Sequence, residues 1–336
     1  MISMKKIAEL CGVSEAAVSY TLRGKRKVNA RTRARILAVA EKHRYRPNAL
    51  VRSIQSKRSM TVGVACNSFG FDFSGRVVNG AVAVLSVNQY EVFVINWNTE
   101  VRDGAHVLRS LGERRVDGVL MYPPYGVDPK TYLDEMRSFH TPLVLVDQIV
   151  AGADCDYVGS DDVPGGEAVM EHLLALGHGK IGIISEPTSP RHKGFSKALA
   201  HHGVPVREQW TCGFGTEGDM YAAVKRMLTE SDRPTAIACC SDTAAIVVYS
   251  AAYDLGLQIP RDLSVTGYAD LIFAREVRPR ITTVSQSPET IGERAARLLL
   301  NRIQQRREEG PDAAVEPEQI LLPTELLIRE STGRPK

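Results

Sequence analysis

The sequence predicts an α/β protein that carries a separate all-α head at its N-terminus. At 336 residues, the chain is longer than one ordinary domain. Residues 1–60, which we call the head, hold 15 Lys and Arg against 3 Asp and Glu, whereas the rest of the chain holds 27 against 36. From Thr61 onward, which we call the body, short apolar runs alternate with amphipathic stretches. That alternation is typical of parallel sheets whose strands are connected by helices.

The composition indicates a globular protein of the cytoplasm. Hydrophobic residues make up 43% and charged residues 24% of the chain. No apolar run reaches the roughly 18 residues that a membrane helix needs, and Met1–Ser3 leads directly into Lys5 rather than into an apolar signal segment. The six cysteines show no CxxC spacing, so we expect reduced thiols, with adjacent Cys239 and Cys240 filling a strand rather than serving redox chemistry.

Residues 1–46 are predicted to form a helix-turn-helix domain. Ser3 is placed to cap a helix that Gly12 ends, and Ser14 is placed to cap a second helix over Glu15–Leu22. Asn29 is placed to cap a third helix. We expect the third helix to close the small core with Ile36, Leu37, Val39 and Ala40.

The basic charge of the head indicates a polyanionic partner. Each phosphate that Lys or Arg neutralises releases condensed counterions, which favours binding. A solvated basic tail is the alternative interpretation. The helix-turn-helix spacing favours double-stranded DNA, because this turn allows the second helix to enter the major groove.

The head resembles the lactose- and purine-repressor family of bacterial transcriptional regulators. The residues that carry the resemblance are Ile7, Ala8, Gly12–Ser14, Val18, Ser19, Val28, Thr32, Arg33 and Tyr45–Asn48. In that family, residues that correspond to 47–60 form a hinge helix and linker, and the hinge folds on operator DNA. By this resemblance Asn48 caps the hinge helix, and Ile54 is the side chain that wedges into the minor groove. An ordinary apolar linker residue is the alternative for Ile54.

The resemblance also implies which residues of the head contact DNA. Glu15, Ala16 and Tyr20 are expected to face base edges. Arg23 stands where relatives often have Asn, and Tyr20 departs from the usual Arg, so we expect an unusual half-site. Contacts that hold the phosphates without reading sequence are expected from Ser14, Ser19, Asn29 and the basic run that contains Lys25.

The body is predicted to hold doubly wound parallel sheets. The expected strands are Val62–Cys66, Val92–Ile95, Val119–Tyr122, Val144–Asp147, Ile181–Ser185, Ala236–Cys240 and Leu263–Gly267. Ligands bind such sheets beyond the carboxyl ends of the strands. Residues just past these runs include Phe71, Phe73, Asp147, Arg191, Ser241, Asp242 and Asp270.

The likeness to the same family continues along the body, which implies a two-lobed domain like that of periplasmic sugar-binding proteins. We expect the whole domain over residues 61–330, with one lobe over 61–159 and 288–318 and the other over 160–287 and 319–330. Matching segments include Asp161–Asp162, His172–His178, Arg191–Phe195, Ser264–Tyr268 and Thr282–Gln286. The resemblance adds Asp161, Phe214 and Gln286 to the expected effector site.

Arg191 is the leading candidate for binding a small-molecule effector. Its planar guanidinium suits a carboxylate, a phosphate or vicinal hydroxyls, so a sugar, a nucleobase or a phosphorylated metabolite would fit. Asp147 and Asp270 are expected to accept ligand hydroxyls, although each could instead cap a loop. Relatives often have Asn where Ser241 stands and an acid where Ala269 stands, so either the effector is atypical or ligand control has been partly lost.

Other function classes find less support in the sequence. Gly213–Gly218 matches GxGxxG, the motif of dinucleotide-binding enzymes, but it lies deep in the chain after a very short strand candidate. The head argues against a solute-binding protein. His172, His178, His192, His201 and His202 lack metal-site spacing with acids, apart from the tandem His201–His202, and are expected on helix surfaces. We therefore expect no enzyme, no cofactor and no metal. We expect a repressor that binds a pseudo-palindromic operator as a homodimer, under the control of an effector in the cleft between the lobes.

Overall fold

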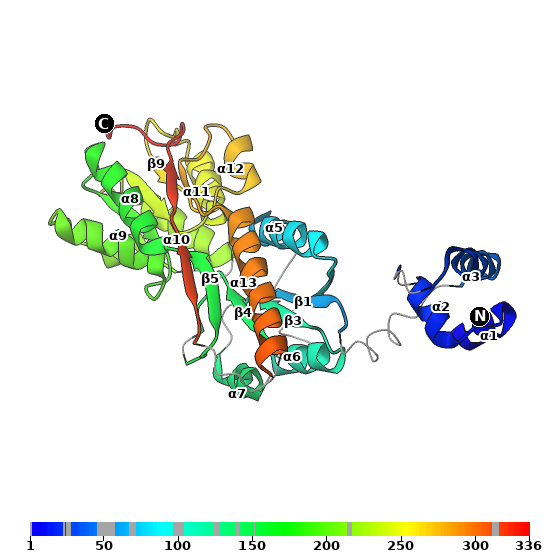
Figure 1. Ribbon diagram of the computed structural model, residues 1–336. Coiled ribbons are helices and arrows are strands. Elements are labelled where there is room, and N and C mark those ends of the chain that lie inside the picture. The colour runs from blue at the N-terminus through cyan, green and yellow to red at the C-terminus, as the bar shows by residue number, and fades with distance from the viewer. Residues whose placement is uncertain are drawn as a thin grey trace. The chain divides into compact units, whose positions relative to one another are not determined.

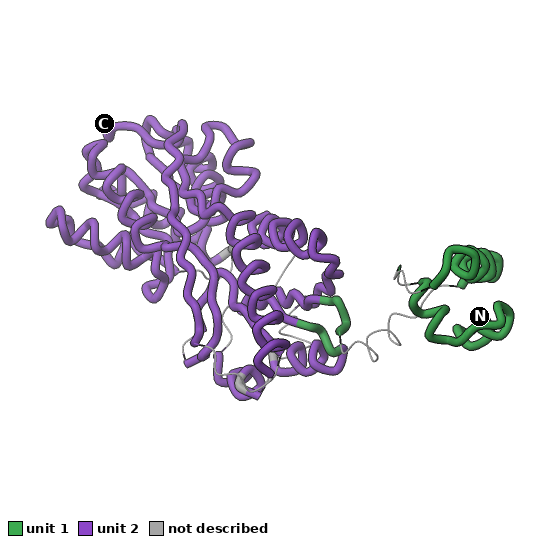
Figure 2. Tube along the Cα trace, in the orientation of Figure 1, with its two compact units in different colours: residues 1–61, 115–117 green, residues 62–114, 118–336 purple. Residues whose placement is uncertain are grey.

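The computed structural model describes residues 2–22, 24, 28–45, 58–66, 72–96, 104–123, 128–138, 141–150, 152–213, 217–310 and 316–336 (Figure 1). The chain forms two compact units, which Figure 2 distinguishes by colour. The first unit is Met1–Thr61 with Arg115–Asp117, and the second is Val62–Arg114 with Gly118–Lys336. The head therefore folds as a unit of its own.

Three predicted N-caps of the head are present as hydrogen bonds. The Ser3 hydroxyl accepts from the backbone N–H of Lys6, and the Ser14 hydroxyl accepts from that of Ala17. The Asn29 side chain likewise accepts from a backbone N–H of the third helix, at 2.8 Å. These caps satisfy donors that would otherwise lack partners in the first helical turn. The helices of the described head are α1 (Met4–Cys11), α2 (Glu15–Leu22) and α3 (Ala30–Lys42).

The head has a small core that differs from the predicted one at one position. The buried apolar residues are Ile7, Ala8, Cys11, Val18, Ile36 and Ala40. Leu37, which we expected in this core, is 45% exposed. Neighbouring residues of a helix point about 100° apart, so Ile36 occupies the inner face of α3 and Leu37 is turned away from it.

The first lobe of the body, which we call the N-lobe, is built on a six-stranded sheet in the order β11-β5-β4-β3-β1-β2 among the described residues. Its strands are β1 (Thr61–Cys66), β2 (Glu91–Asn96), β3 (Gly118–Met121), β4 (Leu143–Val146), β5 (Asp156–Ser160) and β11 (Gln319–Leu322). The pairs β1–β3, β3–β4, β4–β5 and β5–β11 are parallel. The helices of this lobe are α5 (Asp72–Val87), α6 (Gly104–Glu113), α7 (Lys130–Ser138) and α13 (Pro288–Glu309).

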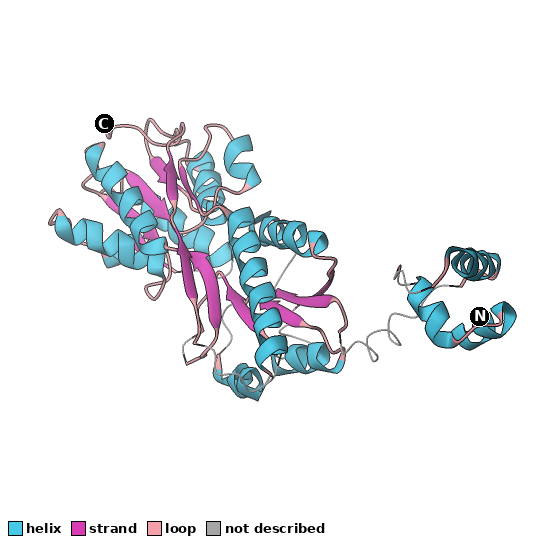
Figure 3. Cartoon of the chain, in the orientation of Figure 1, coloured by secondary structure: helices cyan, strands magenta, loops and turns pink. Residues whose placement is uncertain are grey.

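The second lobe, which we call the C-lobe, has a four-stranded parallel sheet in the order β7-β6-β8-β9 and an antiparallel pair β10–β12 within the described chain. Its strands are β6 (Ile181–Ile184), β7 (Thr211–Cys212), β8 (Ala236–Cys239), β9 (Ser264–Thr266), β10 (Thr283–Ser285) and β12 (Glu325–Leu327). Its helices are α8 (Asp162–Ala175), α9 (Pro190–His201), η1 (Glu208–Trp210), α10 (Glu217–Thr229), α11 (Asp242–Asp254) and α12 (Ile272–Glu276). Helices flank the strands of both lobes in Figure 3.

Every apolar run that we expected to be a strand lies on a strand, with ends that differ by at most one residue. The prediction did not include β5, β10, β11 and β12, and β7 corresponds to the very short strand candidate before Gly213. It also placed residues 319–330 in the C-lobe, whereas β11 pairs with β5 in the N-lobe sheet. The chain therefore crosses from the N-lobe to the C-lobe for the last time after Leu322, which is later than we expected.

The helices α5 and α13 pack backbone against backbone. A Cβ atom added at Gly292 would lie 1.9 Å from the carbonyl oxygen of Val77, and one added at Gly80 would lie 2.1 Å from that of Glu289. Both distances are far below van der Waals contact, so only glycine fits at these positions. Among the described helices, none is long and apolar enough to span a membrane.

Candidate functional site

The first candidate surface is the N-terminal half of α2. Ser14, Glu15 and Ala16 are exposed there, whereas Val18 in the same helix is fully buried. Ser19 and Tyr20 are half-buried, and Asn29 is exposed at the start of α3. The predicted DNA contacts at Arg23, Lys25, Asn48 and Ile54 lie outside the described residues. The structure thus holds the predicted base-reading residues Glu15 and Ala16 on the outside of a folded unit.

The second candidate surface is a polar group at the carboxyl ends of the body strands. Ser160 ends β5, Asp162 begins α8, and Arg191 lies in the first turn of α9 after β6. Tyr268 follows β9 and Gln286 follows β10. We call Ser160, Asp162, Arg191, Tyr268 and Gln286 the strand-end cluster. Its position is the one where doubly wound sheets bind ligands.

Each nitrogen of the Arg191 guanidinium donates to another group of the protein. Its Nε lies 2.9 Å from Oδ2 of Asp162, and its Nη1 lies 2.8 Å from the Cys240 carbonyl oxygen. Its Nη2 lies 3.2 Å from Oε1 of Gln286, and the guanidinium stacks 4.3 Å from the centroid of the Tyr268 ring. A guanidinium has five N–H donors, so among the described residues one donor on each terminal nitrogen is left for a ligand. The side chain is 20% exposed, which leaves it within reach from outside.

Asp162 is the central acceptor of the cluster, and the sequence analysis did not select it. It accepts from the hydroxyl of Ser160 at 2.6 Å, from that of Tyr268 at 3.1 Å and from Nε2 of Gln286 at 3.1 Å. The signal available in the sequence was the adjacent pair Asp161–Asp162, of which only Asp161 was chosen. Asp161 is half-buried at the N-cap of α8, where its side chain makes no capping hydrogen bond.

Asp147 lies directly after β4 with a left-handed backbone conformation, at φ 69°. Burial raises the pKa of its carboxyl to about 6, while the charge of Arg191 lowers it and that of Asp162 raises it further. Asp147 belongs to the N-lobe, whereas Arg191 and Asp162, whose charges act on it, belong to the C-lobe. The Tyr157 hydroxyl, which donates to the backbone carbonyl of Asp147 at 3.1 Å, helps to fix this turn.

Two predicted effector residues instead hold the C-lobe together. Asp242 is fully buried and accepts from the Leu271 backbone N–H at 2.7 Å and from the Thr283 hydroxyl at 2.6 Å. Burial raises the pKa of its carboxyl to about 7. Asp270 is 3% exposed, and its carboxylate lies between Arg275 and Arg329. We correct both predictions, because these carboxylates are buried and bond to groups of the C-lobe, whereas Arg191 is 20% exposed.

The remaining predicted effector residues have varied surroundings. Gln286 is buried, where its Nε2 donates to the Ser160 hydroxyl at 2.6 Å and its Oε1 accepts from Arg191 at 3.2 Å, so its side chain bonds within the protein rather than facing outward, which corrects its predicted role. Ser241 caps α11 by accepting from the Ala244 backbone N–H, and Phe73 is half-buried on α5. The predicted contacts Phe71 and Phe214 lie outside the described residues.

The histidines and cysteines show one clear departure from expectation. His178, expected on a helix surface, is 2% exposed and bonds to Thr235, Ser264 and the Gly333 carbonyl. All six cysteines are free thiols, in line with the predicted reduced state. Ligand atoms of Glu171, His201 and His202 lie within 4.8 Å of one another on the surface of the C-lobe. Exposed groups of this kind are common without a metal, so we assign none there.

Comparison with known proteins identifies the family. Residues 3–48 match the bacterial regulatory proteins of the lacI family, and residues 170–332 match a periplasmic binding protein-like domain. The ribose operon repressor of Haemophilus influenzae is 30% identical over 328 residues, which cover 96% of this chain and 98% of that protein. The chain belongs to the lacI family. It is therefore a DNA-binding transcriptional regulator, and the predicted function class is confirmed.

Other relatives of this lacI-family regulator support the same conclusion. The transcriptional repressor PurR of Mannheimia succiniciproducens is 30% identical over 329 residues, with 96% of this chain and 98% of that protein covered. The Lac repressor dimer bound to operator and the anti-inducer ONPF superposes with a TM-score of 0.85 at 24% identity, over 99% of each chain. A complex of the regulator CelR with cellobiose gives a TM-score of 0.71 at 24% identity, over 98% of this chain and 100% of that one. These structures confirm the predicted fold of a helix-turn-helix head with a two-lobed α/β body.

Proposed function

We propose that this lacI-family regulator represses transcription by binding a pseudo-palindromic operator as a homodimer. The observation that carries the proposal is the exposed N-terminal half of α2 on a separately folded, strongly basic head. A two-fold dimer presents two such helices, and each reads one half-site. The Lac repressor dimer bound to operator supports this arrangement, because its fold matches that of this chain.

Within this proposal the residues of the head have different tasks. Glu15 accepts from a cytosine amino group, Ala16 contacts a thymine methyl group, and Tyr20 donates one hydrogen bond to a base edge. Ile54 wedges into the minor groove at the centre of the site. Asn48 caps the hinge helix that carries Ile54. The positioning contacts to phosphate come from Ser14, Ser19, Arg23, Lys25 and Asn29.

The effector is proposed to bind between the lobes beside the strand-end cluster. Arg191 offers two remaining N–H donors there, and Asp147 offers a carboxylate from the N-lobe. Phe73, Asp161 and Ser241 are the further candidate contacts. Donors and an acceptor of this kind suit a hydroxyl-bearing sugar, a nucleobase or a phosphorylated metabolite. Relatives named for ribose and a CelR complex with cellobiose support a sugar among these classes.

The effector of this regulator is expected to differ from those of its relatives. Three residues that were expected at the ligand bond within the protein instead, namely Asp242 and Asp270 from their position after strands and Gln286 from the resemblance. Ala269 offers only a methyl group where relatives often have an acid. We propose that the protein acts in the cytoplasm and catalyses no reaction, which is supported by relatives that are regulators rather than enzymes.

Selection of bound sequences from random DNA tests the proposal most fully. The full-length protein is run with no added ligand and with a panel of pentoses, hexoses, nucleobases and sugar phosphates. We expect enrichment of one inverted repeat, whose recovery changes with at least one member of the panel. Enrichment of no motif, or of an unpaired single half-site, would contradict the homodimeric repressor. An inverted repeat whose recovery no ligand changes would contradict effector control alone.

A further inference from the structure

One loop of the C-lobe is held unusually tightly beside the strand-end cluster. It comprises residues 268–272, between β9 and α12, and we call it the β9–α12 loop. Ala269 and Asp270 both have left-handed backbone conformations, at φ 101° and φ 52°. Such conformations are costly for residues other than glycine and persist only where the surroundings impose them. The loop therefore has one defined shape that its contacts maintain.

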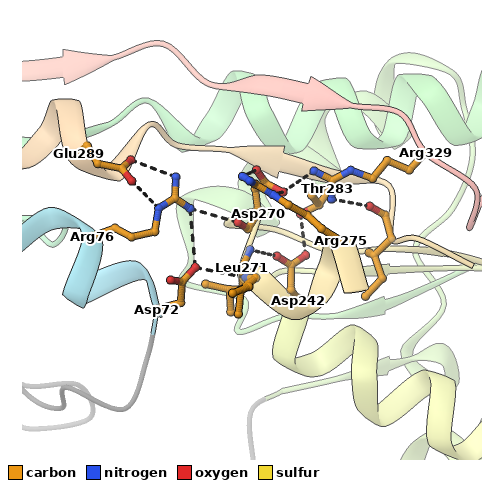
Figure 4. Close-up of polar contacts among 11 residues, drawn as sticks. Asp72, Arg76, Asp242, Asp270, Leu271, Arg275, Thr283, Glu289 and Arg329 are labelled. Atoms are coloured by element: carbon orange, nitrogen blue, oxygen red, sulfur yellow. Dashed lines mark hydrogen bonds and ion pairs between the residues drawn. The ribbon is translucent and has the colours of Figure 1, made fainter. Parts of the chain in front are cut away.

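Those contacts come first from the C-lobe itself. The Asp270 carboxylate lies between the guanidinium groups of Arg275 and Arg329. The backbone N–H of Leu271 donates to Asp242 at 2.7 Å, and that of Ala269 donates to the carbonyl of Val284 in β10. Figure 4 shows these side chains converging on the loop. On this side the loop is fixed to its own lobe.

The other side of the same loop contacts α5 of the N-lobe. Nη1 of Arg76 donates to the backbone carbonyl of Asp270 at 3.2 Å, and Oδ2 of Asp72 accepts from the backbone N–H of Ile272 at 3.2 Å. Asp72 and Arg76 lie one helical turn apart, with 3.8 Å between their charged groups. Helix α5 thus contacts one acceptor and one donor of the loop backbone at the same time (Figure 4). Ile272 is in the first turn of α12, where a backbone N–H has no partner within its own helix.

The Arg76 side chain is also held by α13, the N-lobe helix that packs against α5. Its Nε lies 2.7 Å from Oε1 of Glu289 and its Nη2 lies 3.0 Å from Oε2, which is the two-pronged geometry of a strong arginine–carboxylate pair. Glu289 belongs to α13, which packs against α5 through Gly80 and Gly292 with no side chain between the backbones. A movement of the loop relative to Arg76 is therefore a movement relative to the whole α5–α13 pair.

We propose that Asp72 and Arg76 form an interlobe latch that couples the β9–α12 loop to α5. The loop begins at Tyr268, whose ring stacks on Arg191 and whose hydroxyl donates to Asp162. A ligand that shifts the strand-end cluster moves Tyr268, and the latch passes this shift to the N-lobe, from which the chain leads to the head. The ligand part of the proposal rests on the proposed effector site, whereas the latch itself rests on the contacts of Asp72 and Arg76.

Hydrogen–deuterium exchange of the full-length protein without DNA tests the latch directly. The variants are Arg76→Met, which keeps the aliphatic stem but removes the donors, and Asp72→Ala, which removes the acceptor for Ile272. The control is Arg109→Met, which removes an arginine–glutamate pair of similar length, 3.1 Å to Glu135, elsewhere in the N-lobe. We expect exchange in residues 269–277 to rise by about fivefold or more in both latch variants, as local opening becomes easier. Exchange there that matches the control would overturn the latch.

A charge-swapped double variant separates the latch from the general stability of the lobe. Arg76→Glu with Glu289→Arg keeps an ion pair between α5 and α13 but removes the donor to the Asp270 carbonyl. Exchange in residues 269–277 is expected to rise as in Arg76→Met, while exchange within α13 stays at the unmodified level. Restored protection of the loop in the double variant would show that the ion pair alone matters, and would overturn the latch.

Operator titration supplies the functional test. With DNA obtained from the selection experiment, Arg76→Met is expected to change the operator affinity by about fivefold or more, within the usual range of coupling between distant sites. Arg109→Met is expected to leave it within twofold. An unchanged affinity in Arg76→Met would contradict the coupling. If the unmodified protein binds no operator at all, the proposed function fails, and the exchange experiment still decides whether the latch exists.

Discussion

Nε of Arg191 lies 2.9 Å from Oδ2 of Asp162, so a carboxylate at the start of α8 fixes the guanidinium at the start of α9. The ring of Tyr268 covers one face of that guanidinium. An arginine held in this way loses little conformational entropy when a ligand binds to its remaining donors. The strand-end cluster therefore combines two properties of a binding site, a positioned donor group and access to it.

The pair between Asp162 and Arg191 is expected to stabilise the body. Asp162→Asn removes the charge that Arg191 faces, and we expect the free energy of unfolding of the body to fall by about 2 kcal/mol, the usual contribution of a hydrogen bond to a charged group. Glu167→Gln is the matched control on α8, because Glu167 pairs with the exposed Lys197. Exposed pairs contribute about 0–1 kcal/mol. Urea unfolding of both variants measures the difference, and equal losses would contradict the structural role of Asp162.

The raised pKa of Asp147 predicts a change of stability with pH. Burial raises this pKa from the ordinary 3.8 to about 6 in the folded protein. The folded state therefore binds a proton that the unfolded chain releases at lower pH, so this group's contribution to stability is full below about pH 4 and is lost as the pH rises through about 6. The Asp147→Asn variant has no ionisable group at this position, so it does not lose stability in this way as the pH rises.

Urea unfolding at pH 4.5 and pH 7.5 compares the unmodified protein with Asp147→Asn. We expect the variant to gain stability relative to the unmodified protein at the higher pH. Asp242, whose pKa is raised to about 7 by burial, is present in both proteins and so cancels from the comparison. A difference between the two proteins that is the same at both pH values would contradict the assignment to Asp147.

The turn between α1 and α2 requires glycine for its backbone conformation. Gly12 has φ 55°, and nothing lies within 4 Å of a Cβ atom added there, so Gly12→Ala meets conformational strain but no clash. We expect the head to lose about 1 kcal/mol of stability. Gly75→Ala is the matched control, because its Cβ atom also meets nothing within 4 Å but its backbone is helical. That change is expected to stabilise the body by about 0.5–1 kcal/mol.

Calorimetric unfolding distinguishes these two glycines if the transitions of the head and the body are followed separately. Opposite signs of the two effects are expected. Destabilisation of the body by Gly75→Ala, or an unchanged head in Gly12→Ala, would contradict the local conformations.

Local patterns predicted much of this fold, because capping residues and apolar runs act over a few neighbouring positions. Ser3 and Asn29 cap the helices expected of them, and the apolar strand runs other than Val92–Ile95 are largely buried on both faces of their sheets. The strand β5 was missed because Asp156 opens it. That carboxylate is paired with Arg302, which lies 146 positions further along the chain, so the sequence pattern around Asp156 shows no reason for a strand.

The same limit explains the errors at the candidate site. Asp242 and Asp270 follow strands, as ligand-binding acids do, and nothing nearby in the sequence distinguishes them from such acids. The partners that occupy them include Thr283 and Arg329, which reach them only through the fold. Position after a strand therefore predicted where the polar groups gather, but it did not predict which of them remain available to a ligand.

The hinge supplies a prediction that depends on the sequence and the family. Ile54→Ala is expected to weaken operator binding by about 10-fold or more, because the wedge that bends the DNA is lost. Binding to DNA of unrelated sequence is expected to stay nearly unchanged, since phosphate contacts dominate it. Fluorescence anisotropy on both DNAs measures the two affinities. Equal losses on both, or no loss on the operator, would contradict the role of Ile54.

The ratio of the affinities for the selected operator and for scrambled DNA of the same length tests the central claim most directly. It is measured with the full-length protein by anisotropy titration at several salt concentrations. The account predicts a ratio of about 10³ or more at physiological salt, with both affinities falling steeply as salt rises. Equal affinity for the two DNAs at every salt concentration would contradict sequence-specific recognition by the head.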